Sequence, residues 1–185
     1  VETTDLKPPK AGLLLSPTGT HGVKCDRDNL VLVDLRSGRE PRLTDDGEPY
    51  FGYGRMPDGS LQVIPLKKSG AVLPPFGASF SPDGRYLICP RIDERKVRVD
   101  PFVEHVPTDG SLRPVVHELR RSFTGDQAQT ISDWFVFNVS TGARHQIQLP
   151  LGCSPSMMLG NGVVGWSLKR DQVSMLAMTP ACASG

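Results

Sequence analysis

Two stretches of the chain decide its fold: LLLSPTG at residues 13–19 and, 65 residues later, ASFSPDG at residues 78–84. Each stretch has the composition of a short strand that ends in a Ser-Pro-x-Gly turn. Proline suits the first central position of such a turn, and glycine tolerates the positive φ at its exit. A weaker third copy, VVGWS at residues 163–167, keeps the strand and the serine but lacks the turn.

A second pair of segments repeats as well. NLVLVDLRSG at residues 29–38 and DWFVFNVSTG at residues 133–142 are β-rich runs that end in a polar turn. Each leads into another short predicted strand, at residues 39–44 and 143–149. Read in order, the first unit is a strand, a turn, a strand, a loop, a strand, a hairpin and a strand. This is the four-stranded antiparallel meander of a β-propeller blade.

The repeats predict an all-β chain that forms part of a β-propeller. We expect three to four antiparallel four-stranded blades, of which the last is incomplete, and an inserted arm. An open arc would expose strand edges, so the chain is expected to be a piece of a larger propeller. The predicted parts are a blade at 11–45, an irregular blade at 46–76 with a strand at 61–66, a blade at 77–150, an arm inserted into it at 93–130, and a partial blade at 160–185.

Composition supports this fold class and limits the partners. The 185 residues include 19 Gly and 17 Pro, which suits many short strands and turns better than long helices. The formal net charge is +1, so the sequence gives no reason to expect a nucleic acid or an anionic membrane as the main partner.

Cysteine spacing and hydropathy exclude several other classes. Cys25, Cys89, Cys153 and Cys182 form no C-x-x-C pair, so neither a zinc ribbon nor a disulfide-dense domain is expected, and we predict no metal and no cofactor. The longest uncharged stretch, 150–168, is interrupted by proline and glycine, so no membrane span is expected. No signal peptide is visible, and localisation stays open between periplasmic, secreted and cytoplasmic.

Several strings resemble one known family. SPDGRYL at 81–87, PFVEHVP at 101–107, DGSLRP at 109–114 and GWS at 165–167 resemble the N-terminal propeller of dipeptidyl peptidase IV-like enzymes, in the prolyl oligopeptidase family of serine peptidases. The resemblance implies a propeller that gates and positions peptide substrates. The reaction itself would belong to an α/β-hydrolase domain of the same polypeptide.

The resemblance does not extend to catalytic residues. The family's nucleophile lies on a G-x-S-x-G elbow, and the nearest string here, GASFS at 77–81, lacks the closing glycine. We therefore predict no catalytic residue and no activity for this chain alone. Family members that release dipeptides also carry paired glutamates just before the second Ser-Pro-Gly blade. Residues 52–77 contain only Asp58 as an acid, so this substrate specificity is not expected.

Charged residues at the start of the predicted arm are the candidate site. Arg91, Asp93, Glu94 and Arg95 follow an apolar strand, and loops at the ends of propeller strands carry binding groups. We predict that these four gate the substrate, with a solvated loop of local ion pairs as the alternative. The aromatic segment 50–53 reads as packing of the irregular blade or as the floor of a ligand site.

Other motifs favour simpler interpretations. GNGVVG at 160–165 matches a dinucleotide fingerprint, but strands follow it, so turn chemistry is expected. Glu104-His105 and His117-Glu118 read as loop polarity rather than a metal site or proton relay. The sequon at Asn138 also suits the start of a hairpin turn.

Two predictions concern partners. The arm is expected to contact a second copy of the chain if the protein is a homo-oligomer, because exposed β-arms pair readily with other chains. The alternative to a peptidase part is a non-enzymatic propeller scaffold that binds a protein partner.

Overall fold

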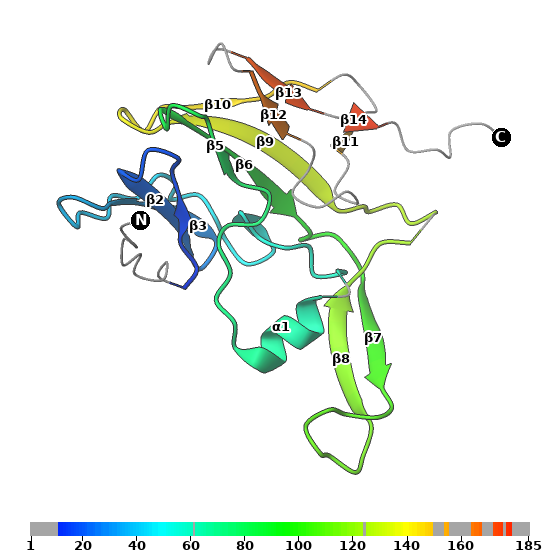
Figure 1. Cartoon of the computed structure of the whole chain (residues 1–185). Helices are drawn as coiled ribbons and strands as arrows, with labels where there is room; N and C mark the ends of the chain where they lie inside the picture. The colour runs from blue at the N-terminus through cyan, green and yellow to red at the C-terminus, as the bar shows by residue number, and fades with distance from the viewer. Residues whose placement is uncertain are drawn as a thin grey trace.

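The computed structural model describes residues 11–60, 62–123, 125–149, 154–155, 164–167, 172–175 and 177–178. Within them the regular structure is nearly all antiparallel strand, and the single α-helix has seven residues. Two packed sheets, a projecting hairpin and a helix beside it make up most of the described chain (Figure 1). The architecture is that of part of a β-propeller, which confirms the predicted fold class.

The first sheet has the order β1-β2-β3, with β1 at Leu14–Leu15, β2 at His21–Asp26 and β3 at Asn29–Asp34. The predicted fourth strand at 39–44 is reduced to one bridge, between Val31 and Arg42. The chain still runs along β3 there, since the Leu32 amide donates to the Pro41 carbonyl at 3.0 Å. Pro41 has no amide hydrogen to donate to the ladder, which shortens the regular pairing.

The second sheet is built around β6 (Tyr86–Asp93), which pairs with β9 (Ile131–Asn138) along its whole length. Beyond β9 lies β10, at Arg144–Gln146. The other edge of β6 pairs with β5 (Ser79–Phe80) near its start and with β4 (Phe51–Tyr53) near its end. The two halves of the blade predicted at 77–150 are therefore joined in one sheet, although 37 residues separate β6 from β9.

Both predicted Ser-Pro-x-Gly turns are present, with the same geometry. Ser16 Oγ accepts a hydrogen bond from the His21 amide at 3.1 Å, and Ser81 Oγ accepts one from the Tyr86 amide at 2.9 Å. The exit glycines have positive φ, +66° in the first turn and +71° in the second. The serine thus ties the turn to the strand that follows it.

The two predicted hairpin turns are equally alike. Asp34 Oδ1 accepts from the amides two and three residues later at 2.9 and 3.2 Å, and Asn138 Oδ1 does the same at 3.0 and 3.1 Å. The Gly38 and Gly142 amides donate to the Asp34 and Asn138 carbonyls, both at 2.8 Å. Asn138 therefore acts as the turn residue that the sequence predicts.

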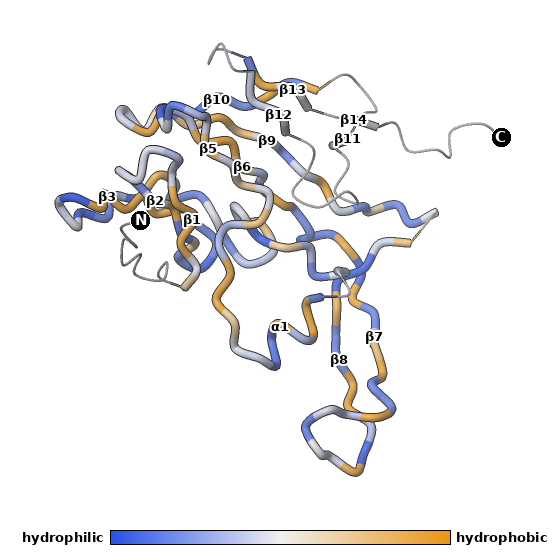
Figure 2. Tube along the Cα trace, in the orientation of Figure 1, coloured by the Kyte–Doolittle hydropathy of each residue, from blue (hydrophilic) through white to orange (hydrophobic). Residues whose placement is uncertain are grey.

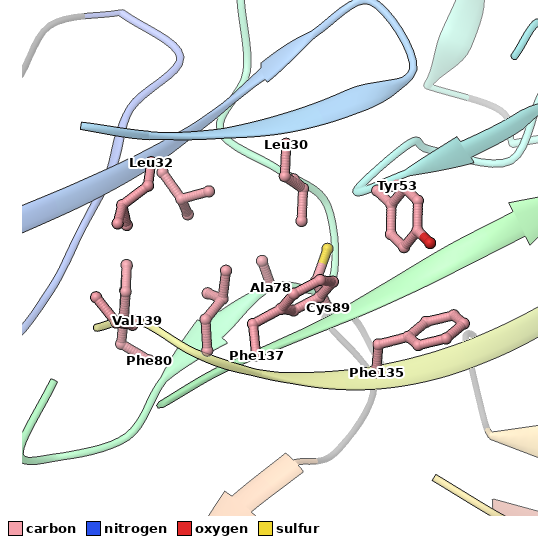
Figure 3. Close-up of a cluster of buried hydrophobic side chains, with 11 residues drawn as sticks. Leu30, Leu32, Tyr53, Ala78, Phe80, Cys89, Phe135, Phe137 and Val139 are labelled. Carbon is pink, nitrogen blue, oxygen red and sulfur yellow. The ribbon is translucent and has the colours of Figure 1, made fainter. Parts of the chain in front are cut away.

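The core lies between the two sheets (Figure 3). Rings from β4 and β9 pack at its centre, with the Tyr53 centroid 5.6 Å from Phe135 and 6.0 Å from Phe137. Such tilted contacts suit aromatic rings, and each buried large side chain stabilises the fold by roughly 1.5–3 kcal/mol. The two sheets contribute most of the cluster, which consists of Val23, Leu30, Leu32, Tyr53, Ala78, Phe80, Leu87, Cys89, Phe135, Phe137 and Val139.

Residues 46–76 differ from the prediction. The expected strand at 61–66 is wrong, because the chain forms helix α1 at Val63–Ser69. Pro65 lies in its first turn, where a missing amide hydrogen is tolerated, and Gly70 ends the helix with φ +62°. Among the described residues the segment makes no sheet of its own. It adds β4 to the second sheet, so the boundaries of an irregular blade stay a prediction.

The inserted arm is a hairpin of β7 (Val99–Glu104) and β8 (Val115–Arg120), which pair only with each other among the described strands. It projects from the end of the second sheet, with α1 beside it (Figure 1). Within the described residues no helix is long and apolar enough to span a membrane.

Four short strands follow near the C-terminus: β11 (Ser154–Pro155), β12 (Val164–Trp166), β13 (Val173–Met175) and β14 (Ala177–Met178). The strand predicted at the third repeat is β12, which pairs with β13. Trp166 Nε1 donates to Ser79 Oγ at 3.1 Å, so this ribbon contacts the second sheet. Residues 160–163 of the GNGVVG string, Cys153 and Cys182 lie outside the described residues.

Candidate substrate-positioning pocket

A cavity of about 350 Å³ lies where the arm leaves the second sheet. Four parts of the chain line it: the turn before α1, the segment between α1 and β5, the end of β8 with the loop after it, and the loop after β6. Its polar groups are one carboxylate, two arginines and three hydroxyls, alongside two apolar rings and a glycine. The residues that line it are Pro57, Gly59, Ser60, Phe76, Glu94, Arg120, Arg121, Ser122 and Thr130.

Glu94 is the buried charged group of this cavity, with 1% of its surface exposed. Both of its carboxylate oxygens lie 3.1 Å from the Asp58 amide nitrogen, and the Thr130 hydroxyl donates to Oε1 at 3.3 Å. Burial raises the Glu94 pKa above its usual value, and the nearby Asp58 carboxylate adds to the rise. A carboxylate can pair with a cationic group of a ligand or accept hydrogen bonds from its donors.

Arg91 does not reach the cavity. It lies in β6, where Nη2 donates to Asp133 of β9 at 2.9 Å and Nη1 donates to Asp46, in the segment between β3 and β4, at 3.2 Å. Its guanidinium stacks 4.1 Å from the Phe51 ring centroid, and its side chain is 15% exposed. Arg144 also donates to Asp46, at 2.8 Å. The Arg91 cluster is therefore an ionic contact between the second sheet and the segment that precedes β4.

Tyr53 and Asp46 are coupled within the same cluster. The Tyr53 hydroxyl donates to Asp46 Oδ1 at 3.1 Å, and burial raises the Tyr53 pKa to about 12. Burial also acts to raise the Asp46 pKa, but hydrogen bonds from Arg144 and Tyr53 outweigh it and hold that pKa below its usual value. The aromatic segment at 50–53 is therefore part of the packing, as the sequence favoured.

Asp93 and Arg95 form an exposed pair at the end of β6. Arg95 Nη2 donates to Asp93 Oδ2 at 2.7 Å and Nη1 donates to Glu48 at 2.6 Å. The Arg95 guanidinium lies 3.8 Å from the centroid of the Phe51 ring, on which Arg91 also stacks. These contacts fit the alternative prediction for this segment, a solvated loop with local ion pairs.

Glu94 is therefore separated from the other three predicted residues. Arg91 and Asp93, two residues apart in β6, point to the same face, and the chain turns after Asp93. Arg91 and Arg95 both stack on the Phe51 ring, and Asp93 pairs with Arg95. Of the four, only Glu94 lines the cavity. No observation tests whether any of them gates a substrate, so that role stays a prediction.

Sequence reasoning missed the groups that hold Glu94 in place. Asp58 is 3% exposed; its amide binds Glu94, while its carboxylate accepts from Lys67 Nζ at 3.0 Å and from the Arg120 amide at 2.9 Å. Tyr50, with φ +63°, has Arg120 4.2 Å from its ring centroid. The only sequence signal was the turn string MPDG at 56–59, which does not reveal that Asp58 is buried.

The arm also brings together Glu104 and His117, which the sequence analysis assigned to loops but which lie in β7 and β8. Glu104 and His117 lie diagonally across the β7–β8 ladder, and His117 Nε2 is 2.9 Å from Glu104 Oε2. Lys68 of α1 donates to both Glu104 oxygens at 2.6 Å. The hydrogen bonds from Lys68 and His117 hold the Glu104 pKa at about 2. Across the described residues, no cluster of three or more His, Cys, Asp or Glu side chains could hold a metal ion.

The fold and the inserted arm define a class of protein, a β-propeller with a hairpin inserted into one blade. No family model and no curated protein matches the chain. Among solved structures, Porphyromonas gingivalis dipeptidyl peptidase 4 is similar, with a TM-score of 0.64 and 16% identity over 90% of this chain and 22% of that chain. A Bacteroides ovatus protein provisionally named dipeptidyl aminopeptidase IV is similar over 92% of this chain and 21% of its own, with a TM-score of 0.58 and 16% identity. At this identity the likeness shows the fold, and the chain spans about a fifth of each neighbour.

Proposed function

We propose that this chain is the non-catalytic propeller part of a serine peptidase that resembles dipeptidyl peptidase IV, and that it gates and positions peptides for a hydrolase domain of the same polypeptide. The observation that carries the proposal is the structural likeness to P. gingivalis dipeptidyl peptidase 4 over 90% of this chain. The family strings at 81–87 and 101–107 support it independently.

The chemistry of the cavity supports a positioning role. A peptide presents amide donors, carbonyl acceptors and charged ends. Here the buried Glu94 carboxylate can accept hydrogen bonds, and the Ser60 and Ser122 hydroxyls can donate or accept them. Phe76 and Pro57 add an apolar wall. A concave site of this size, lined by six polar residues and two apolar rings, suits part of a peptide rather than a whole protein.

The first test is the sequence of the complete gene. The proposal expects a G-x-S-x-G elbow after residue 185, followed by an Asp and a His, because the triad of this hydrolase fold follows that order. A complete gene without these residues would contradict the peptidase assignment. It would favour the scaffold alternative, in which the propeller binds a protein partner and catalyses nothing.

One observation favours a role of the arm in binding another chain. Its distal surface exposes apolar side chains, with Val106 84% and Val116 60% exposed, and the tube coloured by hydropathy shows apolar stretches along it (Figure 2). We propose that this surface contacts a second copy of the protein. Deletion of residues 100–120 should then lower the molecular mass measured by solution scattering, and an unchanged oligomeric state would contradict the role.

A further inference from the structure

Two sets of charged contacts join the arm, helix α1 and the pocket. The distal set is Lys68 with Glu104 and His117, and Lys68 Nζ also lies 3.4 Å from the Thr108 hydroxyl. The proximal set is Asp58, whose carboxylate accepts from Lys67 and from the Arg120 amide. The two lysines are consecutive residues in the last turn of α1.

The distal arm depends on these polar contacts, because little apolar surface fixes it. Its large apolar side chains are exposed, at 44% for Val99, 38% for Phe102 and 39% for Val103. Its strands pair only with each other among the described residues. In contrast, the Lys68 and Glu104 side chains are only 27% and 16% exposed, so their ion pair is shielded from water better than an ordinary surface pair.

The proximal contacts continue into the pocket. Asp58 accepts from Lys67 with its carboxylate and donates its amide to Glu94, so one residue contacts both the helix and the buried carboxylate. Gly59 follows directly, and a Cβ added there would lie 3.2 Å from the Arg120 carbonyl oxygen. A shift of α1 or of the arm base therefore cannot leave the wall of the pocket unchanged, since packed contacts at this spacing transmit displacement.

The geometry points to a mechanical coupling in which the position of the arm sets the position of Glu94, through Glu104, Lys68, helix α1 and Asp58. A chain bound to the arm would then alter the pocket without touching it. This inference deepens the proposed function and rests on it only for the peptide that the pocket would hold. The element that would carry this shift is α1, which is short, exposed on one side and attached through its lysines.

The test measures amide hydrogen exchange, residue by residue, in the whole 185-residue chain with Lys68→Met. Methionine keeps an apolar stem of similar length and removes the charge. The expected result is exchange at least tenfold faster for amides of β7 and β8, and also for the Asp58 amide that binds Glu94. The matched control is Lys24→Met, which breaks an ion pair of the same 2.6 Å separation, with Glu40, in the first sheet. The control should leave the exchange rates of the arm and of Asp58 unchanged.

Two results would overturn the coupling. If Lys68→Met loosens the arm but leaves the Asp58 amide protected, the arm is not connected to the pocket. If neither changes, the distal contact does not hold the arm. Glu104→Gln is a second variant that removes the same contact from the other side. It should give the same increases, and the double variant should add nothing further. The exchange measurement uses no substrate. A negative result would therefore contradict the coupling but not the peptidase assignment, and a complete gene without the hydrolase motif would not affect the exchange result.

Discussion

Replacement of Arg91 by methionine tests the ionic contact between the second sheet and the segment before β4. The change removes two charge-assisted hydrogen bonds, to Asp133 at 2.9 Å and to Asp46 at 3.2 Å. Such bonds contribute roughly 1.5–3 kcal/mol each when buried. The carboxylates are 30% and 33% exposed, so water screens part of this contribution.

The two partners respond differently to the loss. Asp46 keeps Arg144 and the Tyr53 hydroxyl, whereas Asp133 keeps only the Gln146 amide, at 3.3 Å, among the described contacts. Methionine retains most of the packing on the Phe51 ring but loses the cation–π attraction, which is about 0.5–1 kcal/mol at a site of this exposure. Together these terms predict a loss of about 2–4 kcal/mol in the free energy of unfolding.

Urea denaturation followed by tryptophan fluorescence and circular dichroism measures this loss. Lys24→Met is the control, because the exposed pair of Lys24 with Glu40 should contribute less than about 1 kcal/mol. Arg91→Lys should lie between wild type and Arg91→Met, since one ammonium group cannot bridge both carboxylates in the planar geometry of a guanidinium. A loss below about 0.5 kcal/mol for Arg91→Met, equal to that of the control, would refute the reasoning.

Three further predictions follow from burial. Phe137→Ala should lower the free energy of unfolding by about 3–5 kcal/mol in urea denaturation, because the ring is fully buried between the sheets, and a loss under about 1 kcal/mol would place it outside the core. Burial raises the pKa of the Cys25 thiol to about 12 and that of the Cys89 thiol well above its usual value. Iodoacetamide at pH 8 should therefore alkylate both thiols slowly in the folded chain and rapidly in urea, as measured by peptide mapping. Equal alkylation rates in the two conditions would contradict the burial of these thiols. Because the folded Glu94 pKa lies above the unfolded value, the stability that this group contributes is present below the unfolded pKa and is lost as pH rises through the folded pKa, so Glu94→Gln should become more stable relative to wild type over that rise. A difference that does not vary with pH would show that Glu94 has an ordinary pKa.

The turns could be predicted from the sequence because their chemistry is local. Ser16 and Ser81 bond to amides five residues ahead, and Asp34 and Asn138 bond to amides two and three residues ahead. Residue types alone therefore specify these turns. Once the repeated turns are aligned, the strands between them and the fold class follow.

The helix α1 and the site could not be predicted in the same way. Apolar residues predict a strand at 61–66, but a short apolar run suits either state, and the contact of Lys68 with Glu104, 36 residues away, favours the helix. Glu94 binds an amide 36 residues away, so its burial depends on tertiary packing. Its neighbours Arg91 and Arg95 read alike in sequence, yet both stack on the Phe51 ring and neither lines the cavity.

The most direct test of the central claim is covalent labelling with a serine-directed fluorophosphonate probe. Peptide hydrolysis in this family requires a serine activated by a histidine beside an oxyanion hole, and the chain contains no motif that would supply them. The account predicts that the protein encoded by the complete gene is labelled on one serine outside residues 1–185 and hydrolyses prolyl or alanyl dipeptide amides, while the 185-residue chain is neither labelled nor active. Labelling of a serine within residues 1–185 at the rate of the complete protein would contradict the claim that this propeller positions peptides for chemistry performed elsewhere.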